Sequence, residues 1–175
     1  MVNQANEGKI QSDTKHIWEL LKNIPDPEMP YISIVDLGII REISWEYDSL
    51  RVVVTPTYSG CPAKKSIEED ICRILTDHGV VSVILESRLY PPWTTDWISK
   101  EGREKLLIEG VSPPLPVDTG WQTLKFLPIE KSKVISCPQC GSNQTQLQSE
   151  FGGTACKSLY MCESCLNPFE YFKSL

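Results

Sequence analysis

Apolar residues in the first fifty positions recur with two different periods. Between positions 17 and 24 they follow the spacing i, i+3, i+4, i+7 that is typical of one helix face: Ile17, Leu20, Leu21 and Ile24. Ser12 or Asp13 can cap the start of this helix, and Pro25 ends it. Side chains then alternate from residue 39 to residue 47, and LRVVVTPT after the turn YDSL is rich in β-branched residues. These two segments are predicted to form a β-hairpin.

The helical period returns after the second strand. Pro62 suits a first helical turn, and four apolar residues follow it at helical spacing: Ile67, Ile71, Ile74 and Leu75. Gly79 is expected to end this helix, and VVSVILESRL is predicted to be a third strand. The order α-β-β-α-β predicts an α+β domain in which helices pack on a small three-stranded sheet.

Prolines and short strands divide the rest of the chain. A short helix is expected from about Ser99 to Glu109. The stretch SPPLPVDTGWQTLKFLPIEKSK has several prolines and no clean periodicity, which indicates a linker. Three short strand candidates follow it: TQLQSEF, KSLYMC and PFEYFK. The sequence therefore predicts three parts, an α/β domain over 12–112, a proline-rich linker over 113–133 and a β module over 134–175.

Four cysteines in the last part have metal-ligand spacing. They form two C-x2-C pairs separated by 21 residues: Cys137, Cys140, Cys162 and Cys165. Two tight turns of this kind complete a tetrahedral four-thiolate set that suits Zn2+, so we predict a zinc ribbon. A closed set has no open position for substrate, which favours a structural role. An iron site of the rubredoxin type, or a share of an iron–sulfur cluster, would use the same ligands.

Composition and charge disfavour several classes of function. The chain has 17 Lys and Arg against 23 Asp and Glu, a formal net charge of -6. This acidity argues against nucleic-acid binding, which needs clustered Lys and Arg, and against an anionic membrane surface. No apolar run approaches the roughly 20 residues that span a bilayer, and MVNQANEGKIQSDTK lacks the apolar core of a signal peptide. We therefore expect a cytoplasmic protein whose seven cysteines stay reduced.

The stretch TPTYSGCPAKK brings Cys61 to the start of the second predicted helix. Unpaired N–H groups and the helix dipole stabilise a thiolate there, and Lys64 and Lys65 add positive charge. We therefore expect a lowered pKa and a reactive thiol or metal ligand. Asp26 and Glu28 of PDPEMP are candidate partners if the fold brings that loop alongside. In the alternative interpretation the thiol packs under the helix and both acids are solvated.

Two further cysteines and the two histidines have simpler interpretations. Cys156, in FGGTACKSLY, is either a buried small apolar residue or an auxiliary ligand beside the metal site. Cys72 is interpreted as a core residue of the second helix. His16 and His78 have no convincing partner in sequence, so a Cys-His catalytic pair is weakly supported.

Longer motifs resemble a known family. IPDPEMPYISIVDLGIIREI, followed by TPTYSGCPA, resembles the iron–sulfur-assembly type of domain found in SufT-like proteins. PPWTTDWISKEGREKL, GVSPP, CPQCGS and SEFGGTACKSLYMCESCLNPFEYFK are similar to the PaaD family of accessory proteins, which are associated with phenylacetyl-CoA 1,2-epoxidase in aerobic phenylacetate degradation. The match runs from about Ile17 to Lys173. Ser174 stands where family members often carry a further cysteine, so any role of that thiol is in doubt.

The resemblance implies an accessory protein that is not itself catalytic. It implies help in assembling or repairing iron or iron–sulfur centres of the epoxidase, with protein clients that include a di-iron oxygenase and an iron–sulfur reductase. The family's acidic loop falls on Asp26 and Glu28, and its reactive cysteine on Cys61. Its zinc ligands fall on the four cysteines of the two C-x2-C pairs.

Three hypotheses follow for the function. In the first, Cys61 with Asp26 and Glu28 transiently holds iron or an iron–sulfur cluster, or contacts a client, and the zinc ribbon is a docking module. In the second, Cys61 is the nucleophile or redox centre of a thiol enzyme, which would need a positioned base. A pure client-docking adaptor is a variant of the first, and a nucleic-acid-binding ribbon is the least favoured. The sequence leaves open whether the chain forms a homo-oligomer.

Overall fold

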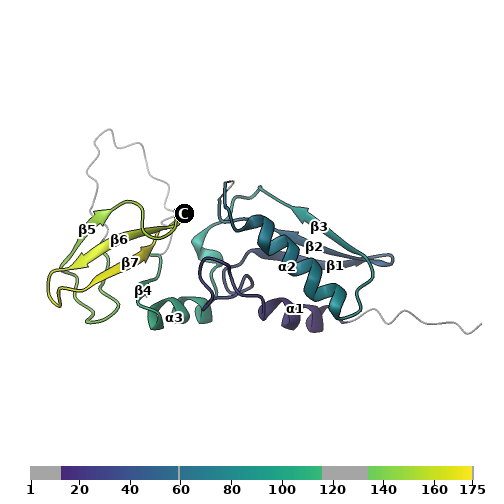
Figure 1. Cartoon of the computed structure of the whole chain (residues 1–175), viewed down its shortest axis with the longest axis horizontal. Coiled ribbons are helices and arrows are strands. Elements are labelled where there is room, and N and C mark those ends of the chain that lie inside the picture. Colours follow the sequence, from purple (N-terminus) through teal and green to yellow (C-terminus); the bar gives the residue numbers. More distant parts are fainter. Residues whose placement is uncertain (1–12, 59, 116–133, 175) are drawn as a thin grey trace, which may run out of the picture.

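The computed structural model of the chain describes residues 13–58, 60–115 and 134–174 (Figure 1). Most of the predicted linker lies outside these residues. The elements follow one another as α1 (Thr14–Lys22), β1 (Ile40–Glu46), β2 (Ser49–Val54), α2 (Lys64–Asp77), β3 (Val83–Ser87), the 3-10 helix η1 (Thr95–Trp97), α3 (Lys100–Ile108), β4 (Val111–Ser112), β5 (Thr145–Ser149), β6 (Lys157–Cys162) and β7 (Pro168–Phe172).

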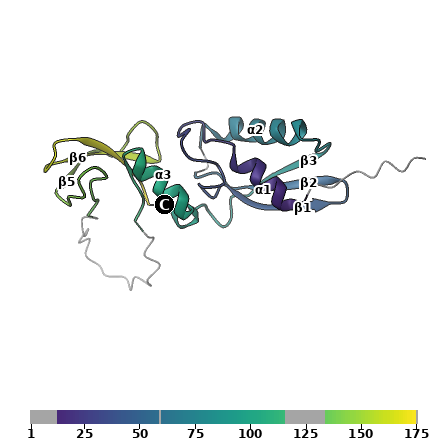
Figure 2. The same cartoon turned by 90° about the horizontal axis from the view of Figure 1, so that it is seen from below.

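The first sheet has the strand order β1-β2-β3. β1 is antiparallel to β2, as the predicted hairpin requires, whereas β3 is parallel to β2 and α2 forms the crossover between them. Figures 1 and 2 show α1 and α2 on one face of this sheet. Alternate residues of the central strand belong to the core beneath them: Leu50, Val52 and Val54. The ends of β2 and β3 that precede the Cys61 loop and the Leu89 loop therefore lie at the same edge of the sheet.

A local signal explains where α1 begins, and the apolar period explains which face α1 and α2 each bury. The carboxylate of Asp13 accepts a hydrogen bond from the N–H of Lys15 at 3.2 Å and so caps α1. The predicted apolar faces are buried in both helices: Ile17 and Leu21 in α1, and Ile67, Ile71 and Leu75 in α2. These periodic predictions are therefore confirmed.

The second sheet has the strand order β4-β7-β6-β5. β4 comes from the segment after α3 and pairs in parallel with β7, where Val111 lies opposite Glu170. Phe172 and Cys156 of the second module are buried in the same apolar cluster as the core of the first. The rings of Trp93 and Phe172 have centroids 6.1 Å apart. The two modules thus share a packed junction.

The segment between β3 and β4 is fastened to the loop that precedes β1. The indole N–H of Trp93 donates to the carbonyl oxygen of Leu37 at 2.9 Å. The buried carboxylate of Asp36 accepts hydrogen bonds from the Ser99 hydroxyl at 3.1 Å and from Lys105 Nζ at 2.6 Å. These contacts hold α3 against the first module and place β4 at the junction.

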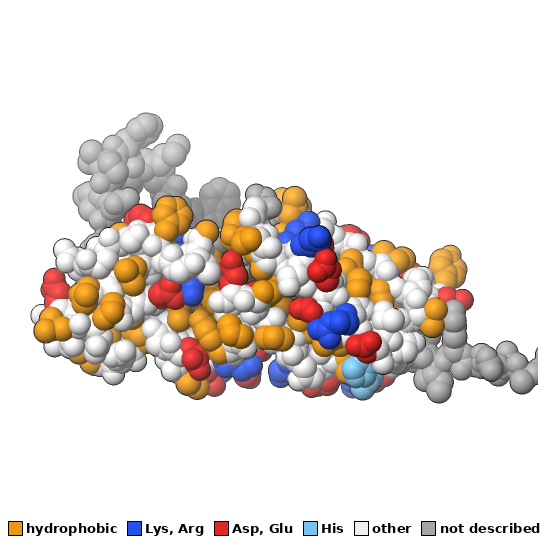
Figure 3. Space-filling model, in the orientation of Figure 1, with side chains coloured by type: hydrophobic (Ala, Val, Ile, Leu, Met, Phe, Trp, Pro, Cys, Tyr) orange, Lys and Arg blue, Asp and Glu red, His pale blue; other side chains and the backbone are white. Residues whose placement is uncertain are grey.

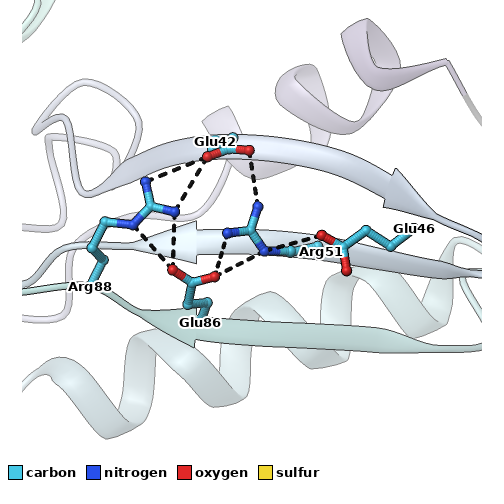
Figure 4. Close-up of polar contacts among 5 residues, drawn as sticks. All are labelled: Glu42, Glu46, Arg51, Glu86 and Arg88. Atoms are coloured by element: carbon cyan, nitrogen blue, oxygen red, sulfur yellow. Dashed lines mark hydrogen bonds and ion pairs between the residues drawn. The ribbon is translucent and has the colours of Figure 1, made fainter.

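Charged side chains cover the other face of the first sheet. Figure 4 shows Arg51 and Arg88 interleaved with three glutamates on neighbouring strands: Glu42, Glu46 and Glu86. Arg51 lies 2.9 Å from Glu42 and 3.4 Å from Glu46 and also pairs with Glu86. On the face drawn in Figure 3, acidic and basic side chains are mixed and do not form a basic patch. This mixture differs from the clustered positive charge that phosphate binding needs.

The predicted fold class, an α+β domain of α-β-β-α-β order followed by a β zinc ribbon, is confirmed. The two-residue strand β4 was not predicted, although it joins the second sheet from within the predicted first domain. The domain limits 12–112 and 134–175 remain predictions. No helix within the described ranges is long and apolar enough to cross a membrane.

Candidate functional site

Four cysteines of the second module form one compact cluster. Their sulfur atoms all lie within 4.8 Å of one another: Cys137, Cys140, Cys162 and Cys165. The sulfurs of Cys137 and Cys165 are 3.7 Å apart, and those of Cys140 and Cys162 are 3.6 Å apart. A tetrahedron with metal–sulfur bonds near 2.3 Å has sulfur–sulfur edges of about 3.8 Å. The cluster therefore fits a tetrahedral metal ion bound by four thiolates.

Both cysteine pairs are folded into the same kind of turn. The N–H of Gly141 donates to the carbonyl of Cys137, and the N–H of Leu166 to that of Cys162, each at 2.9 Å. Gly141 and Leu166 close these turns with φ angles of 71° and 60°. The backbone N–H of Cys165 is the main cause that lowers the pKa of Cys162 to about 6. A backbone hydrogen bond from Ser142 lowers the pKa of Cys140, but burial and the three neighbouring cysteine side chains outweigh it and raise this pKa to about 12. The turns thus bring the four sulfurs together and favour a thiolate at Cys162 before a metal binds.

The acidic loop after α1 is held by its own backbone. Asp26 N–H donates to the Ile32 carbonyl at 2.9 Å, and Oδ1 of Asp26 accepts hydrogen bonds from the N–H groups of Glu28 and Met29 at 3.0 and 2.9 Å. The Asp26 side chain is buried, and burial raises its pKa against these two hydrogen bonds. Asp26 therefore shapes the loop and presents Glu28, which is half-buried, beside it.

Cys61 lies in the turn between β2 and α2, three residues before the helix begins. Burial of the half-buried thiol raises its pKa, although the N–H of Ala63 and the hydroxyl of Thr57 hydrogen-bond to the sulfur and lower it. The expectation of a lowered pKa is therefore wrong. Lys64 and Lys65 each lie 3.7 Å from a glutamate one turn later in α2. Their positive charge therefore does not offset the effect of burial on the Cys61 thiolate.

The fold brings the acidic loop alongside Cys61. After burial and the two hydrogen bonds, the negative charges of Glu28 and Asp26 also raise the pKa of the Cys61 thiol. A small hollow beside the thiol is lined by four apolar residues, Ile39, Val54, Pro56 and Ile67, together with Thr57, Lys64 and Glu68. Asp26, Glu28 and Cys61 do not form a second group as tight as the four-cysteine cluster within the residues described. Glu28 and Asp26 thus act on the Cys61 thiol through their charge, while the buried Asp26 carboxylate is hydrogen-bonded to its own loop.

Cys156 does not belong to the four-cysteine cluster. It is 5% exposed and packs in the core of the first module, and its pKa is raised by burial and further by the charge of Glu28. Tyr58 was not singled out from the sequence, yet burial and the charges of Cys61, Glu28 and Cys156 all raise its pKa. Its only sequence signal is its position, three residues before Cys61.

Neither histidine is positioned to act as a general base for Cys61. His78 caps the far end of this 14-residue helix, with Nδ1 2.8 Å from the Ile74 carbonyl oxygen. A helix of that length separates its ends by about 20 Å. His16 lies on the exposed side of α1.

These modules define a class of protein, in which an iron–sulfur-assembly-type domain is fused to a four-cysteine zinc ribbon. Residues 14–83 match the family model "Iron-sulfur cluster assembly protein", and residues 125–173 match "PaaD zinc beta ribbon domain". A protein of Escherichia coli K12, described as a putative subunit of 1,2-phenylacetyl-CoA epoxidase, is 44% identical over 159 residues, which cover 91% of this chain and 92% of that protein. The chain belongs to this PaaD family.

Two solved structures are also similar. A domain of unknown function from Bacillus anthracis is 24% identical and covers 53% of this chain and 89% of its own, with a TM-score of 0.49. A conserved hypothetical protein from Thermotoga maritima is 30% identical and covers 54% of this chain and 94% of its own, with a TM-score of 0.47.

Proposed function

We propose that the chain is an accessory protein of a phenylacetyl-CoA epoxidase system and helps to assemble or repair an iron or iron–sulfur centre there. Cys61 and the loop of Asp26 and Glu28 would hold the iron cargo transiently. The observation that carries the proposal is the approach of this acidic loop to the Cys61 thiol, in a chain related to an epoxidase component. The clients would be other proteins of that system, such as its oxygenase or reductase.

The chemistry of this proposed site suits a cargo better than a permanent cofactor. A thiolate with neighbouring carboxylates binds ferrous iron, but an incomplete ligand set leaves the ion exchangeable. Burial raises the pKa of Cys61, so protons compete with the metal at neutral pH. Both effects favour release to a client with a complete ligand set.

For the four-cysteine cluster we propose a structural zinc ion. All four positions around the metal are taken by thiolates, so no position is left for a substrate. A module of about 40 residues buries too little apolar surface to fold unaided, and metal binding would supply much of its folding free energy. The folded ribbon would then serve as a surface for protein contacts.

Metal analysis of anaerobically purified protein tests the cargo site. Iron, zinc and acid-labile sulfide are counted per chain in the wild type, in Cys61→Ser and in Cys72→Ser, whose thiol is half-buried in α2. We expect about one zinc in all three proteins, from the four-thiolate ribbon. Iron or sulfide should be present in the wild type and in Cys72→Ser and be lost in Cys61→Ser.

The result also separates a carrier from an adaptor. Zinc alone in every protein would contradict the cargo site and favour a client-docking adaptor, in which Cys61 acts through partner contact. His78 lies at the far end of α2 from Cys61, so its position does not support a thiol enzyme with a Cys-His pair. The accessory role itself is tested by co-expression, since the iron content of the oxygenase should fall when Cys61→Ser replaces the wild type.

A further inference from the structure

Strand β3 forms one edge of the first sheet. In the part of the chain that the structure describes it pairs with β2 alone, and Figure 1 shows it at the margin of the sheet. The carbonyl oxygen of Ser82 accepts from the N–H of Leu50, and the N–H of Arg88 donates to the carbonyl oxygen of Val54, each at 2.8 Å. Even-numbered residues from 82 to 88 therefore direct their backbone groups toward β2, and odd-numbered ones direct theirs outward. Such a row of outward N–H and C=O groups can pair with a further strand.

Exposed apolar side chains are concentrated along this edge. Eleven large apolar residues are exposed in the described ranges, and four of them fall within positions 81–90: Val81, Ile84, Leu89 and Tyr90. β1 forms the opposite edge of the sheet, is described throughout and contains none of the eleven. Pro91 follows Tyr90 and lacks an N–H, so a pairing segment would end there. An apolar edge of this kind is typical of a surface that another strand covers.

The residues of this edge are complementary to themselves. They read ILESRLY from position 84 to position 90, with Ser87 at the centre. Two copies that pair antiparallel about a two-fold axis at Ser87 bring apolar residues opposite apolar ones and the acidic residue opposite the basic one. The facing pairs are Ile84 with Tyr90, Leu85 with Leu89 and Glu86 with Arg88, and each of them occurs twice.

Other positions of the axis lose this match. The outward backbone groups belong to odd-numbered residues, so an odd-numbered residue has to face another one and the axis has to pass through a residue. An axis at Glu86 or at Arg88 would set that charge opposite its own copy, which is destabilising. An axis at Leu85 would set the apolar side chain of Ile84 opposite the charge of Glu86. The register centred on Ser87 is therefore favoured by both the hydrogen bonds and the charges.

We propose that a second copy of the chain covers β3, antiparallel about a two-fold axis at Ser87, so that the two first sheets form one continuous sheet. Within one chain Arg88 lies 3.0 Å from Glu86, and the two side chains are still 35% and 39% exposed. Each of these charges can therefore also reach its opposite in the second copy. The inference does not depend on the proposed cargo function.

The position of the axis has a consequence for Cys61. Ser87 lies opposite Val54, the last residue of β2, and the loop that carries Cys61 follows β2. Both copies of this loop would therefore leave the sheet at the end of β3 where the axis passes.

Sedimentation equilibrium of the zinc-loaded full chain, with a reductant that prevents disulfides, tests the pairing. We expect a wild-type dimer with a Kd on the order of 10–100 μM, since one strand from each copy forms a small interface. Ser87→Pro removes an outward N–H from each copy and leaves the pairing with β2 intact, and Leu89→Lys places a charge among apolar residues. Each should raise the Kd at least about tenfold, because the change occurs twice in the dimer. Leu107→Lys is the matched control, since this exposed leucine lies on α3, and it should dimerise like the wild type.

A charge exchange tests the register itself. Glu86→Arg makes both charged positions of the edge basic, and Arg88→Glu makes both acidic. Each variant alone should dimerise at least about tenfold more weakly than the wild type, whereas their equimolar mixture should associate about as tightly, because every facing pair is then of opposite charge. Leu89→Lys lies outside the ion pairs and decides the outcome if a charge variant does not fold, as judged by circular dichroism. A wild type that stays monomeric up to about 0.5 mM, a mixture no tighter than its parts, or equal weakening by Leu107→Lys would overturn the inference.

Discussion

Asp36 and Lys105 form an ion pair that joins the loop before β1 to α3. The carboxylate is 2% exposed, and its Oδ2 lies 2.6 Å from Lys105 Nζ. Burial raises the pKa of Asp36, but the hydrogen bonds from Lys105 and from serine hydroxyls outweigh it and keep the pKa below its ordinary value of 3.8. Without the lysine, a buried carboxylate loses its cation. We expect Lys105→Met to lower the free energy of unfolding at pH 7 by about 1–3 kcal/mol, measured by urea unfolding.

Lys100→Met is the matched control for this pair. Lys100 lies on the same helix, is 86% exposed and is 3.8 Å from Glu104, so its loss should change stability by less than about 0.5 kcal/mol. A carboxylate with a lowered pKa stabilises the fold while it is ionised, and this contribution is lost as the pH falls below 3.8. The difference between the two variants should therefore shrink in acid. Equal stability of the variants at pH 7 would show that the pair contributes nothing.

Individual site residues could be predicted where spacing alone fixes the chemistry. The two C-x2-C pairs predicted the four-cysteine cluster, because the turn of each pair is local and one metal ion brings the two turns together. The pKa of Cys61 could not be predicted, since it depends on burial and on lysines that pair within α2. The burial of Cys156 in the core of the first module could not be predicted either, because it depends on how the two modules pack.

At the scale of elements, the turn before β1 depends on a glycine. Gly38 has a φ of +70°, and a Cβ there would lie 2.6 Å from the backbone carbonyl oxygen of Trp97. Gly79, at the end of α2, also has a positive φ of +85°, but a Cβ there would meet nothing within 4 Å. We expect Gly79→Ala to destabilise the fold by about 1–2 kcal/mol. Gly38→Ala should cost about 1–3 kcal/mol more, because it also pushes η1 away from the loop.

Thermal unfolding of both variants measures this difference. A larger fall in Tm for Gly38→Ala is expected, together with a change in tryptophan fluorescence, since Trp93 and Trp97 lie in the displaced segment. The same fall in Tm for both variants would mean that the chain removes the clash between the new Cβ at position 38 and Trp97 without losing stability.

Elements with their own hydrophobic period could be predicted, and those without one could not. α1 and α2 bury the residues that the period indicated, and the strands of both sheets lie where alternating or β-branched stretches stand. β4 has only two residues, too few for a period, and it is a strand because β7 pairs with it. Its existence is a property of the packed chain.

The whole molecule is organised around the junction of its modules. The pairing of β4 with β7 and the contact between Trp93 and Phe172 hold the ribbon against the first module. The ribbon core, in contrast, is small, and we expect it to depend on a metal ion bound by the four cysteines. Metal removal should therefore unfold the ribbon and open the junction, while α1 and α2 keep their own core.

Chelation followed by pulsed thiol alkylation and mass spectrometry tests this division. Cys156 is 5% exposed and should be alkylated slowly with metal bound, then at least about tenfold faster after chelation, since a group in a locally unfolded module reacts as if exposed. Cys72 lies in α2, far from the ribbon in the fold, and should keep its rate. Far-ultraviolet circular dichroism should retain the helical signal. If Cys72 instead became reactive together with Cys156 and the helical signal disappeared, the two modules would unfold as one unit, and the ribbon metal would support the entire chain.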